Sequence, residues 1–283
     1  MAGSFETIAT RDYWRTLAPS FHIADREFLA PHAADMGSTG LIAAAGIGAD
    51  GYVQLRGIDL AADFAGMTEV ARALTAHNLD AVFCFVYDEF WRPYFRLDAL
   101  FRHLLGPYTF LPDFWAWDVD PKRGGSGWAR HRDRGRMALR DDGSPISLTT
   151  WIAISEATPE NGCLRMVPKH RDPTYNTPHE NDPLFNEADV RVLPALPGDV
   201  LIWNQAVMHW GGRAEPRASH SRVSMSFETQ RLDVPSREAP LIAPWRIVSF
   251  EERLKLIGQK LLHYRHMHAI APALETLAQE LAG

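Results

Sequence analysis

The feature that most constrains the fold is a series of short β-type runs in the middle of the chain. Gly, Pro, Asp and Asn separate these runs, which span 108–118, 127–134, 146–156, 162–167, 189–194, 199–203, 206–210 and 221–231. Short strands repeated at this spacing are typical of a sandwich or barrel, and the jelly roll is the commonest large version. We therefore expect a β-core over residues 107–231.

The residues before this core are predicted to be largely helical. Apolar side chains in Leu60–His77 recur at helical spacing, and a second helix over Leu97–Leu105 ends before Gly106-Pro107. Residues 50–57 (DGYVQLRG) alternate in polarity and predict a strand. Residues 1–45 show no sustained period and predict irregular chain with a helix or two.

The C-terminal residues return to helix. Ser249-Phe-Glu-Glu252 is a capping box, in which the Ser hydroxyl and the Glu carboxylate satisfy free amides at a helix start. The helix carries His263, His266 and His268, which do not all share one face and are predicted to be surface or interface residues.

The chain contains no internal repeat or low-complexity linker, so we expect a single domain of 283 residues. It would consist of a helical N-terminal part (1–106), the β-core (107–231) and C-terminal helices (245–283). The fold class expected is mainly β with helical caps, that is α+β.

Composition excludes several classes of partner. A net charge of −6 gives no basic footprint for nucleic acid or an anionic membrane, and two cysteines provide no disulfide framework. The first residues (MAGSFETIATRDYWRT) lack the pattern of a signal peptide, and the run 41–49 is too short to span a bilayer. We expect a cytoplasmic protein that acts on a small molecule, with helices that could form a homo-oligomer interface.

The clearest chemical signal is His131-Arg-Asp133. On a strand, residues two apart point to the same face, so an imidazole and a carboxylate would converge on one point. His209 follows a buried-looking strand and could bring a third ligand from a distant part of the chain. Two histidines and one carboxylate on one face of a metal leave three positions open, as non-haem Fe(II) oxygenases require.

Arg222 opens a further strand thirteen residues after His209. Its planar guanidinium could hold the distal carboxylate of a small dicarboxylic cosubstrate through two parallel hydrogen bonds.

Taken in order, these segments resemble the phytanoyl-CoA dioxygenase family of Fe(II)/2-oxoglutarate-dependent dioxygenases. The resemblance covers residues 50–231 and rests on DGYVQLRG (50–57), His131-x-Asp133, LTTWIAISEATPENGCLRMVPKHR (148–171), PGDVLIWNQAVMHWGG (197–212) and the Arg222 strand. It implies a double-stranded β-helix, the cupin-like jelly roll.

The resemblance also implies a set of binding residues. Iron would be held by His131, Asp133 and His209, and 2-oxoglutarate partly by Arg222. Arg213 and Arg217 are alternatives to Arg222, because the family arginine usually lies about eleven residues after the second histidine. Trp151 matches a family tryptophan that would pack against 2-oxoglutarate, although a core tryptophan is an equal alternative.

The activity implied is hydroxylation of an unactivated C–H bond in a small molecule, with O2 consumed and succinate and CO2 released. Halogenating relatives have Gly or Ala where this chain has Asp133, so a carboxylate here favours hydroxylation. Two alternatives remain open. One is a cupin-like metalloenzyme that uses Zn or Mn for hydrolysis or isomerisation, and the other is a non-catalytic protein that binds 2-oxoglutarate or metal.

Three further residues are candidates for contact with substrate. Arg134 or Arg136 could meet an anionic group, although alternation also predicts that the arginines at 130, 132, 134 and 136 form a solvated or salt-bridged outer face. His170 matches a family histidine near the site entrance, with a surface-loop histidine as the alternative.

Overall fold

The computed structural model describes residues 5–182, 184–236 and 238–283. Its helices are α1 (Phe5–Ile8), α2 (Arg11–Leu17), α3 (Thr39–Asp50), α4 (Phe64–Ala76), α5 (Arg92–Arg96), α6 (Asp98–Leu105), α7 (Phe250–Tyr264) and α8 (Pro272–Ala282). Its strands are β1 (Tyr52–Leu55), β2 (Tyr108–Val119), β3 (Ser147–Ala153), β4 (Leu164–Met166), β5 (Arg191–Leu193), β6 (Val200–Asn204), β7 (His209–Gly211) and β8 (Arg222–Arg231). Short 3-10 turns are η1 (Ala81–Val86), η2 (Asp88–Phe90), η3 (Pro121–Arg123), η4 (Gly135–Ala138), η5 (Lys169–Arg171) and η6 (Glu187–Asp189).

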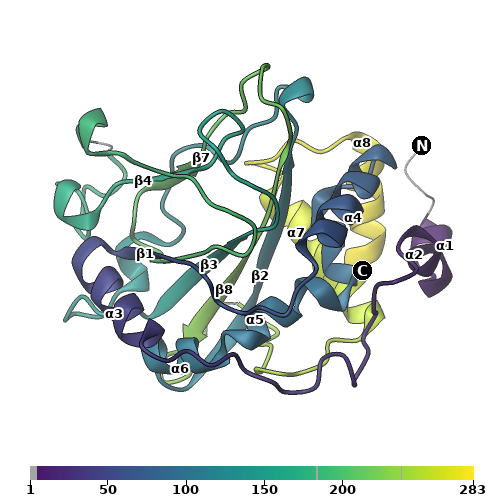
Figure 1. Cartoon of the computed structure of the whole chain (residues 1–283), viewed down its shortest axis with the longest axis horizontal. Coiled ribbons are helices and arrows are strands. Elements are labelled where there is room, and N and C mark those ends of the chain that lie inside the picture. Colours follow the sequence, from purple (N-terminus) through teal and green to yellow (C-terminus); the bar gives the residue numbers. More distant parts are fainter. Residues whose placement is uncertain (1–4, 183, 237) are drawn as a thin grey trace.

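The strands form two antiparallel sheets. The larger sheet has the order β1-β6-β3-β8-β2, and the smaller has the order β5-β4-β7 (Figure 1). A compact apolar cluster joins the two sheets, because it contains Trp151 of β3, Trp203 of β6 and Leu164 of β4. The two sheets therefore pack face to face around a shared interior.

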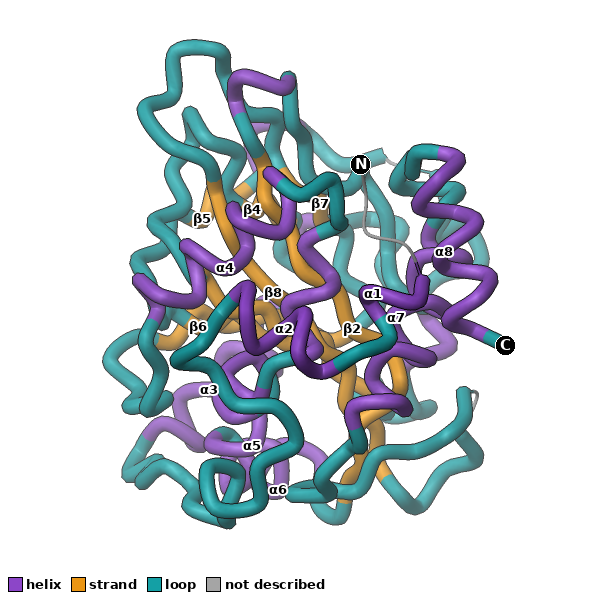
Figure 2. Tube along the Cα trace, turned by 90° about the vertical axis from the view of Figure 1, so that its right-hand side faces the viewer, coloured by secondary structure: helices purple, strands orange, loops and turns teal. Residues whose placement is uncertain are grey.

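The other face of the large sheet is covered by helices. Figure 2 shows α1, α2, α4 and α7 in front of the strands. Alternation along each strand separates the two faces. On β3, for example, Leu148 and Ile152 pack in the large core beneath the helices, whereas Thr149 and Trp151 face the interior between the sheets.

An irregularity in β2 brings one carboxylate into this interior. The register between β2 and β8 shifts between Phe110 and Phe114, where Pro112 has no N–H to donate to the ladder. Asp113 lies within this bulge, is buried and lines the interior cavity. The bulge therefore places a charged group that strict alternation would not have placed there.

The predicted mixed architecture, with antiparallel strands between helical ends, is confirmed. The Ser249 hydroxyl accepts a hydrogen bond from the Glu252 N–H at 3.2 Å and caps α7, which confirms this half of the predicted capping box, whereas the Glu252 carboxylate accepts from Arg246 instead of a free amide. Helix α4 begins at Phe64, later than predicted, because the Asp63 side chain caps it by accepting from the Gly66 N–H. Among the described residues, no helix combines the length and apolar character that a membrane crossing needs.

Two details of the strand prediction are wrong. Residues 127–134 are not a strand: they run beside β7 but form only an isolated bridge between His131 and His209. The chain leaves the extended conformation because the N–H groups of Arg134 and Gly135 both donate to the Gln205 carbonyl. In addition, β1 belongs to the large sheet, so the core begins before residue 107.

A buried ion pair ties α7 to the segment below it. Arg253 is 1% exposed, pairs with Asp88 and donates to the carbonyls of Val86 and Val248. Removing one partner leaves the other charge buried and unpaired. We predict that Arg253→Met lowers the free energy of unfolding by about 3–5 kcal/mol.

Urea denaturation of the wild type and the variant measures this loss. The matched control is Arg265→Met, because Arg265 pairs with Glu275 at an exposed position where ion pairs contribute at most about 1 kcal/mol. Equal losses in the two variants would contradict a special role for the buried pair.

Candidate metal centre

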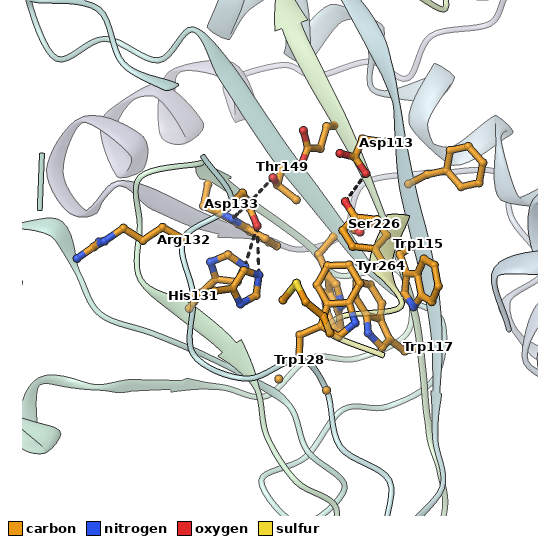
Figure 3. Close-up of a pocket in the computed structure, with 18 of the residues that line it drawn as sticks. Asp113, Trp115, Trp117, Trp128, His131, Arg132, Asp133, Thr149, Ser226 and Tyr264 are labelled. Atoms are coloured by element: carbon orange, nitrogen blue, oxygen red, sulfur yellow. Dashed lines mark hydrogen bonds and ion pairs between the residues drawn. The ribbon is translucent and has the colours of Figure 1, made fainter. Parts of the chain in front are cut away.

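Two chain segments far apart in the sequence bring three potential ligands together. His131 and His209 exchange backbone hydrogen bonds of 3.0 Å in both directions, and their rings lie 4.3 Å apart. Asp133 Oδ1 lies 3.3 Å from His131 Nε2 and 3.4 Å from His209 Nε2 (Figure 3). One potential ligand atom from each residue lies within 4.8 Å of the others, close enough to share a metal ion.

Backbone contacts orient both imidazoles. Nδ1 of His131 lies 2.6 Å from the Ala129 carbonyl, and Nδ1 of His209 lies 3.1 Å from the Val207 carbonyl. Because a carbonyl can only accept, each Nδ1 must carry the proton, which leaves Nε2 as a lone-pair donor. His131 Nε2 is buried and has no hydrogen-bond partner, as expected for a ligand that faces a metal position.

Two donors from the large sheet hold the carboxylate. Asp133 Oδ2 accepts from the Thr149 hydroxyl at 2.7 Å and from the Trp203 indole N–H at 2.8 Å, so Oδ1 faces the histidines. Burial would raise the pKa of Asp133, but His209, His131 and the Thr149 hydrogen bond together hold it well below its ordinary value. The carboxyl is therefore ionised and ready to bind a cation.

The histidines differ in their pKa. Burial lowers the pKa of His209 to about 4, even though Asp133 opposes the shift. Burial also acts to lower the pKa of His131, but the Asp133 carboxylate, 3.3 Å from its Nε2, outweighs burial and raises this pKa. His209 is thus neutral at pH 7, and a metal that binds there displaces no proton from it.

Arg132, between the two ligands, points away from them. Its side chain is nearly buried, forms an ion pair of 2.7 Å with Asp172 and donates to the carbonyls of Glu180 and Ala206. The prediction of a salt-bridged residue is correct, but its solvated alternative is wrong. These bonds fix the loop that carries His131 and Asp133.

Arg222 lies on the same cavity as the three potential ligands. It is 1% exposed, donates one N–H to the Ser224 hydroxyl, and leaves its Nε without any partner. Burial lowers the pKa of Arg222 to about 10, so the guanidinium remains charged at pH 7. A buried cation without an ionic partner is costly unless an anion binds beside it.

The structure separates the three candidate arginines. Arg213 and Arg217 are exposed, and Arg217 forms an ion pair with Glu215 on the surface. Trp151 is buried and lines the cavity, with its ring centroid 5.9 Å from the Arg222 guanidinium and its Nε1 unpartnered. Of the three arginines, only Arg222 lines this cavity.

Beside Arg222, the backbone segments at Gly127 and Gly211 lie too close together to leave room for a Cβ atom. A Cβ built on Gly211 would lie 2.6 Å from the Gly127 Cα and 3.4 Å from an Arg222 guanidinium nitrogen. These two glycines let the loop before His131 approach β7, and this approach encloses the cavity over Arg222.

The cavity has a volume of about 410 Å³, within the range of about 300–1,000 Å³ usual for small-molecule sites. Sequence reasoning did not find much of the remaining cavity lining, part of which Figure 3 shows beside His131 and Asp133. The lining residues that it missed include Asp113, Trp115, Trp117, Trp128, Glu228, Glu238, His263, Tyr264, His266 and Met267. The alternation in WAWD (115–118) indicates that Trp115 and Trp117 of β2 share one face of a strand. No pattern in the sequence indicates that the α7 residues line the cavity.

The remaining candidates have varied positions. Arg134 lines the cavity, but it is bound by Asp113, Glu228 and Glu238 and so has no charge free for an anionic substrate. Arg136 and His170 lie outside the cavity lining, and His170 pairs with Asp50 at the surface. His263 and His266 are exposed, as predicted for surface residues, and they also line the cavity, whereas His266 and His268 lie beyond the end of α7 and not in the helix as predicted.

Comparison with known proteins adds a family to this geometry. The model of the family described as Phytanoyl-CoA dioxygenase (PhyH) matches residues 51–219, more than half of the chain. A curated relative is the iron/alpha-ketoglutarate-dependent dioxygenase ausU of Aspergillus calidoustus, which is 24% identical over 129 residues. That match covers 45% of this chain and 40% of the relative, so it spans less than half of the relative's length.

Solved structures share the fold. The non-haem alpha-ketoglutarate-dependent epimerase SnoN from nogalamycin biosynthesis has a TM-score of 0.53 at 21% identity, over 75% of this chain and 92% of its own. The non-haem monooxygenase ThoJ has a TM-score of 0.56 at 16% identity, over 84% of this chain and 99% of its own. At these identities the likeness establishes the fold and leaves the reaction open.

The two donors to Asp133 predict an effect on metal binding. Thr149→Val and Trp203→Phe each remove a hydrogen bond that orients the carboxylate, and losses of this kind weaken metal affinity about 10–100-fold. Anaerobic titration with Fe(II) measures the dissociation constant. The matched control is Thr150→Val on the same strand, because Thr150 is buried and its hydroxyl has no partner. Equal affinities for the Thr149 and Thr150 variants would contradict the assignment.

Proposed function

The chain belongs to the phytanoyl-CoA dioxygenase family, and we propose that it is an Fe(II)- and 2-oxoglutarate-dependent oxygenase that hydroxylates an unactivated C–H bond of a small molecule. One observation carries this proposal. The cavity that holds His131, Asp133 and His209 also holds Arg222, a buried cation without an ionic partner. A site for a divalent metal and a site for an anion therefore open into the same space.

The donor set fits Fe(II). Two imidazole nitrogens and one carboxylate oxygen are the ligands of non-haem iron oxygenases, and they leave coordination positions free for a cosubstrate and O2. The Nδ1 contacts of His131 and His209 leave both Nε2 atoms facing Asp133 Oδ1, so a metal ion here would be held by Nε2 of each histidine and by a single Asp133 oxygen. We assign these three residues as the iron ligands.

The surroundings of Arg222 fit 2-oxoglutarate. A distal carboxylate would pair with the guanidinium and satisfy its free Nε. The unpartnered Trp151 Nε1 is a further buried donor beside the same guanidinium. We assign Arg222 and Trp151 to the cosubstrate, and Arg213 and Arg217 to the surface.

When bound together, iron and 2-oxoglutarate couple the reduction of O2 to the release of succinate and CO2 and to the oxidation of a C–H bond. The protein positions the reactants and limits access of water. Trp128, Trp203 and Trp151 supply apolar surface around the ligand set, and this lowers the local dielectric. With iron bound, Asp133 would occupy a coordination position that a halide would otherwise take, which favours hydroxylation.

The fold supports a finer description. Two facing antiparallel sheets that enclose a metal site are consistent with a double-stranded β-helix, and we propose this cupin-like topology for the core. We also propose that all 283 residues form one oxygenase domain, because β1 and the helices of both ends pack against the same large sheet.

The first test is reconstitution under anaerobic conditions. We predict that Fe(II) and 2-oxoglutarate together produce a weak visible charge-transfer band, and that added O2 yields succinate. His131→Ala and His209→Ala should abolish the band, since each removes an iron ligand.

Other outcomes would favour the alternatives. A band without succinate from folded protein would indicate a non-catalytic binding protein. Absence of the band, together with turnover that depends on Zn or Mn alone, would indicate a cupin-like hydrolase or isomerase.

The second test concerns Arg222. Removing one member of a buried charge pair costs enough binding energy that Arg222→Ala should raise the Michaelis constant for 2-oxoglutarate on the order of 100-fold or more. Arg222→Lys keeps the positive charge but loses the planar guanidinium that can form two parallel hydrogen bonds. Its Michaelis constant for 2-oxoglutarate should therefore lie between those of the wild type and Arg222→Ala. Arg217→Ala is the control and should match the wild type. The Michaelis constant of each variant is obtained by measuring the rate of succinate release as a function of 2-oxoglutarate concentration.

A further inference from the structure

One wall of the cavity, beside the metal ligands, is aromatic. Trp128 lies 5.9 Å from the His131 ring, and its neighbours Tyr264 and Trp115 are 4.5 Å and 5.7 Å away (Figure 3). Trp117 extends the same surface, 5.1 Å from Trp128. These rings come from β2, from the loop before His131 and from α7, so the fold gathers an aromatic surface of mutually tilted rings beside the proposed iron site.

The same wall contains donors without acceptors. The Nε1 atoms of Trp115, Trp117 and Trp128 are buried and have no hydrogen-bond partner. Trp115 is itself 1% exposed, so its N–H is shielded from bulk solvent. A buried donor that lacks an acceptor is costly, and edge-on contact with a neighbouring ring compensates only weakly. A bound molecule with acceptor atoms would remove this cost.

The charged side chains near this wall are already paired with one another. Arg134 contacts Asp113, Glu228 and Glu238, and Lys260 contacts two of these three carboxylates. Burial, followed by the charge of Asp113, raises the pKa of Glu228 well above its usual range, which favours a neutral carboxyl. Both cations are engaged with carboxyl groups of the protein, so neither is left to pair with a substrate anion.

From these contacts we propose that the substrate is an uncharged ring compound that directs carbonyl or ether oxygens at the indole N–H groups of Trp115 and Trp128. This inference rests on the proposed oxygenase function, since it describes the molecule oxidised at the same site. The aromatic wall buries the ring, and the two indoles fix which edge of it faces the iron ligands.

Other substrate classes fit this wall less well. An anion would meet three carboxyl groups whose two cation partners are already engaged. A cation would meet carboxylates that already have cation partners, next to Arg134. An apolar ring without oxygen would leave the indole donors unsatisfied, and a site built to hydrogen-bond its substrate discriminates against such an analogue.

Four bicyclic probes of similar size separate these classes. Chromone is neutral and carries carbonyl and ether oxygens, N-methylquinolinium is a cation, 2-naphthoate is an anion, and naphthalene has no acceptor. Their dissociation constants are measured by calorimetry on the protein loaded anaerobically with Fe(II) and 2-oxoglutarate. We expect chromone to bind most tightly of the three polar probes. Tighter binding of either ion, or no binding of chromone at millimolar concentration, would overturn the proposal.

Variants test the indole donors directly. Trp115→Phe and Trp128→Phe remove the N–H together with part of the ring, so the loss of area affects chromone and naphthalene alike. The loss of the hydrogen bond affects only chromone. It should weaken chromone binding by roughly a further 3- to 10-fold relative to naphthalene binding. Trp210→Phe is the control, because Trp210 packs against Phe185 and Arg130 outside this cavity.

Repeating the titrations on metal-free protein separates the two proposals. Chromone selectivity without a charge-transfer band would reject the proposed oxygenase and retain the substrate-binding wall. A band with equal losses for chromone and naphthalene in the Phe variants would retain the oxygenase and show that neighbouring rings satisfy the indoles. Thermal unfolding of each variant verifies that it is folded.

Discussion

The two-residue period of the large sheet is the constraint on which the rest of the structure depends. On β3, β6 and β8, one set of alternate side chains packs beneath the helices and the other set faces the interior. Thr149, Trp203 and Arg222 belong to the second set. A slip of one residue in any of these strands would turn its functional side chains into the helical core. The extensive apolar packing on the helix side therefore fixes the site on the other side.

The metal ligands themselves depend on a less regular device. His131 and Asp133 lie in a loop, and the sheet reaches them only through side chains: Thr149 and Trp203 bind the carboxylate, and β7 bridges the backbone of His131. Arg132 then anchors the loop from behind through Asp172. These polar contacts fix the geometry of the loop, as backbone pairing fixes that of a strand. Each contact requires a particular residue.

These differences explain what the sequence could predict. His131, Asp133, His209 and Arg222 were predictable because their residue types and order along the chain carry the chemistry. The strand proposed for residues 127–134 was wrong because Gln205 competes for the amides of Arg134 and Gly135, a contact between distant segments. The α7 side of the cavity was not predictable for the same reason, because His263 and Tyr264 reach it only after the helix packs on the sheet.

The cavity joins two environments, and each contains buried polar groups that lack a partner within the protein. At Arg222 a buried cation lacks an ionic partner, and at Trp115 and Trp128 buried donors lack acceptors. Both are costs that a folded protein tolerates where a ligand removes them. An anion would pair with Arg222, whereas neutral oxygen atoms would accept from the indoles of Trp115 and Trp128. The two ends of the cavity therefore favour two different molecules. His131, Asp133 and His209 lie on the cavity that contains both ends, where a metal can bring cosubstrate and substrate together.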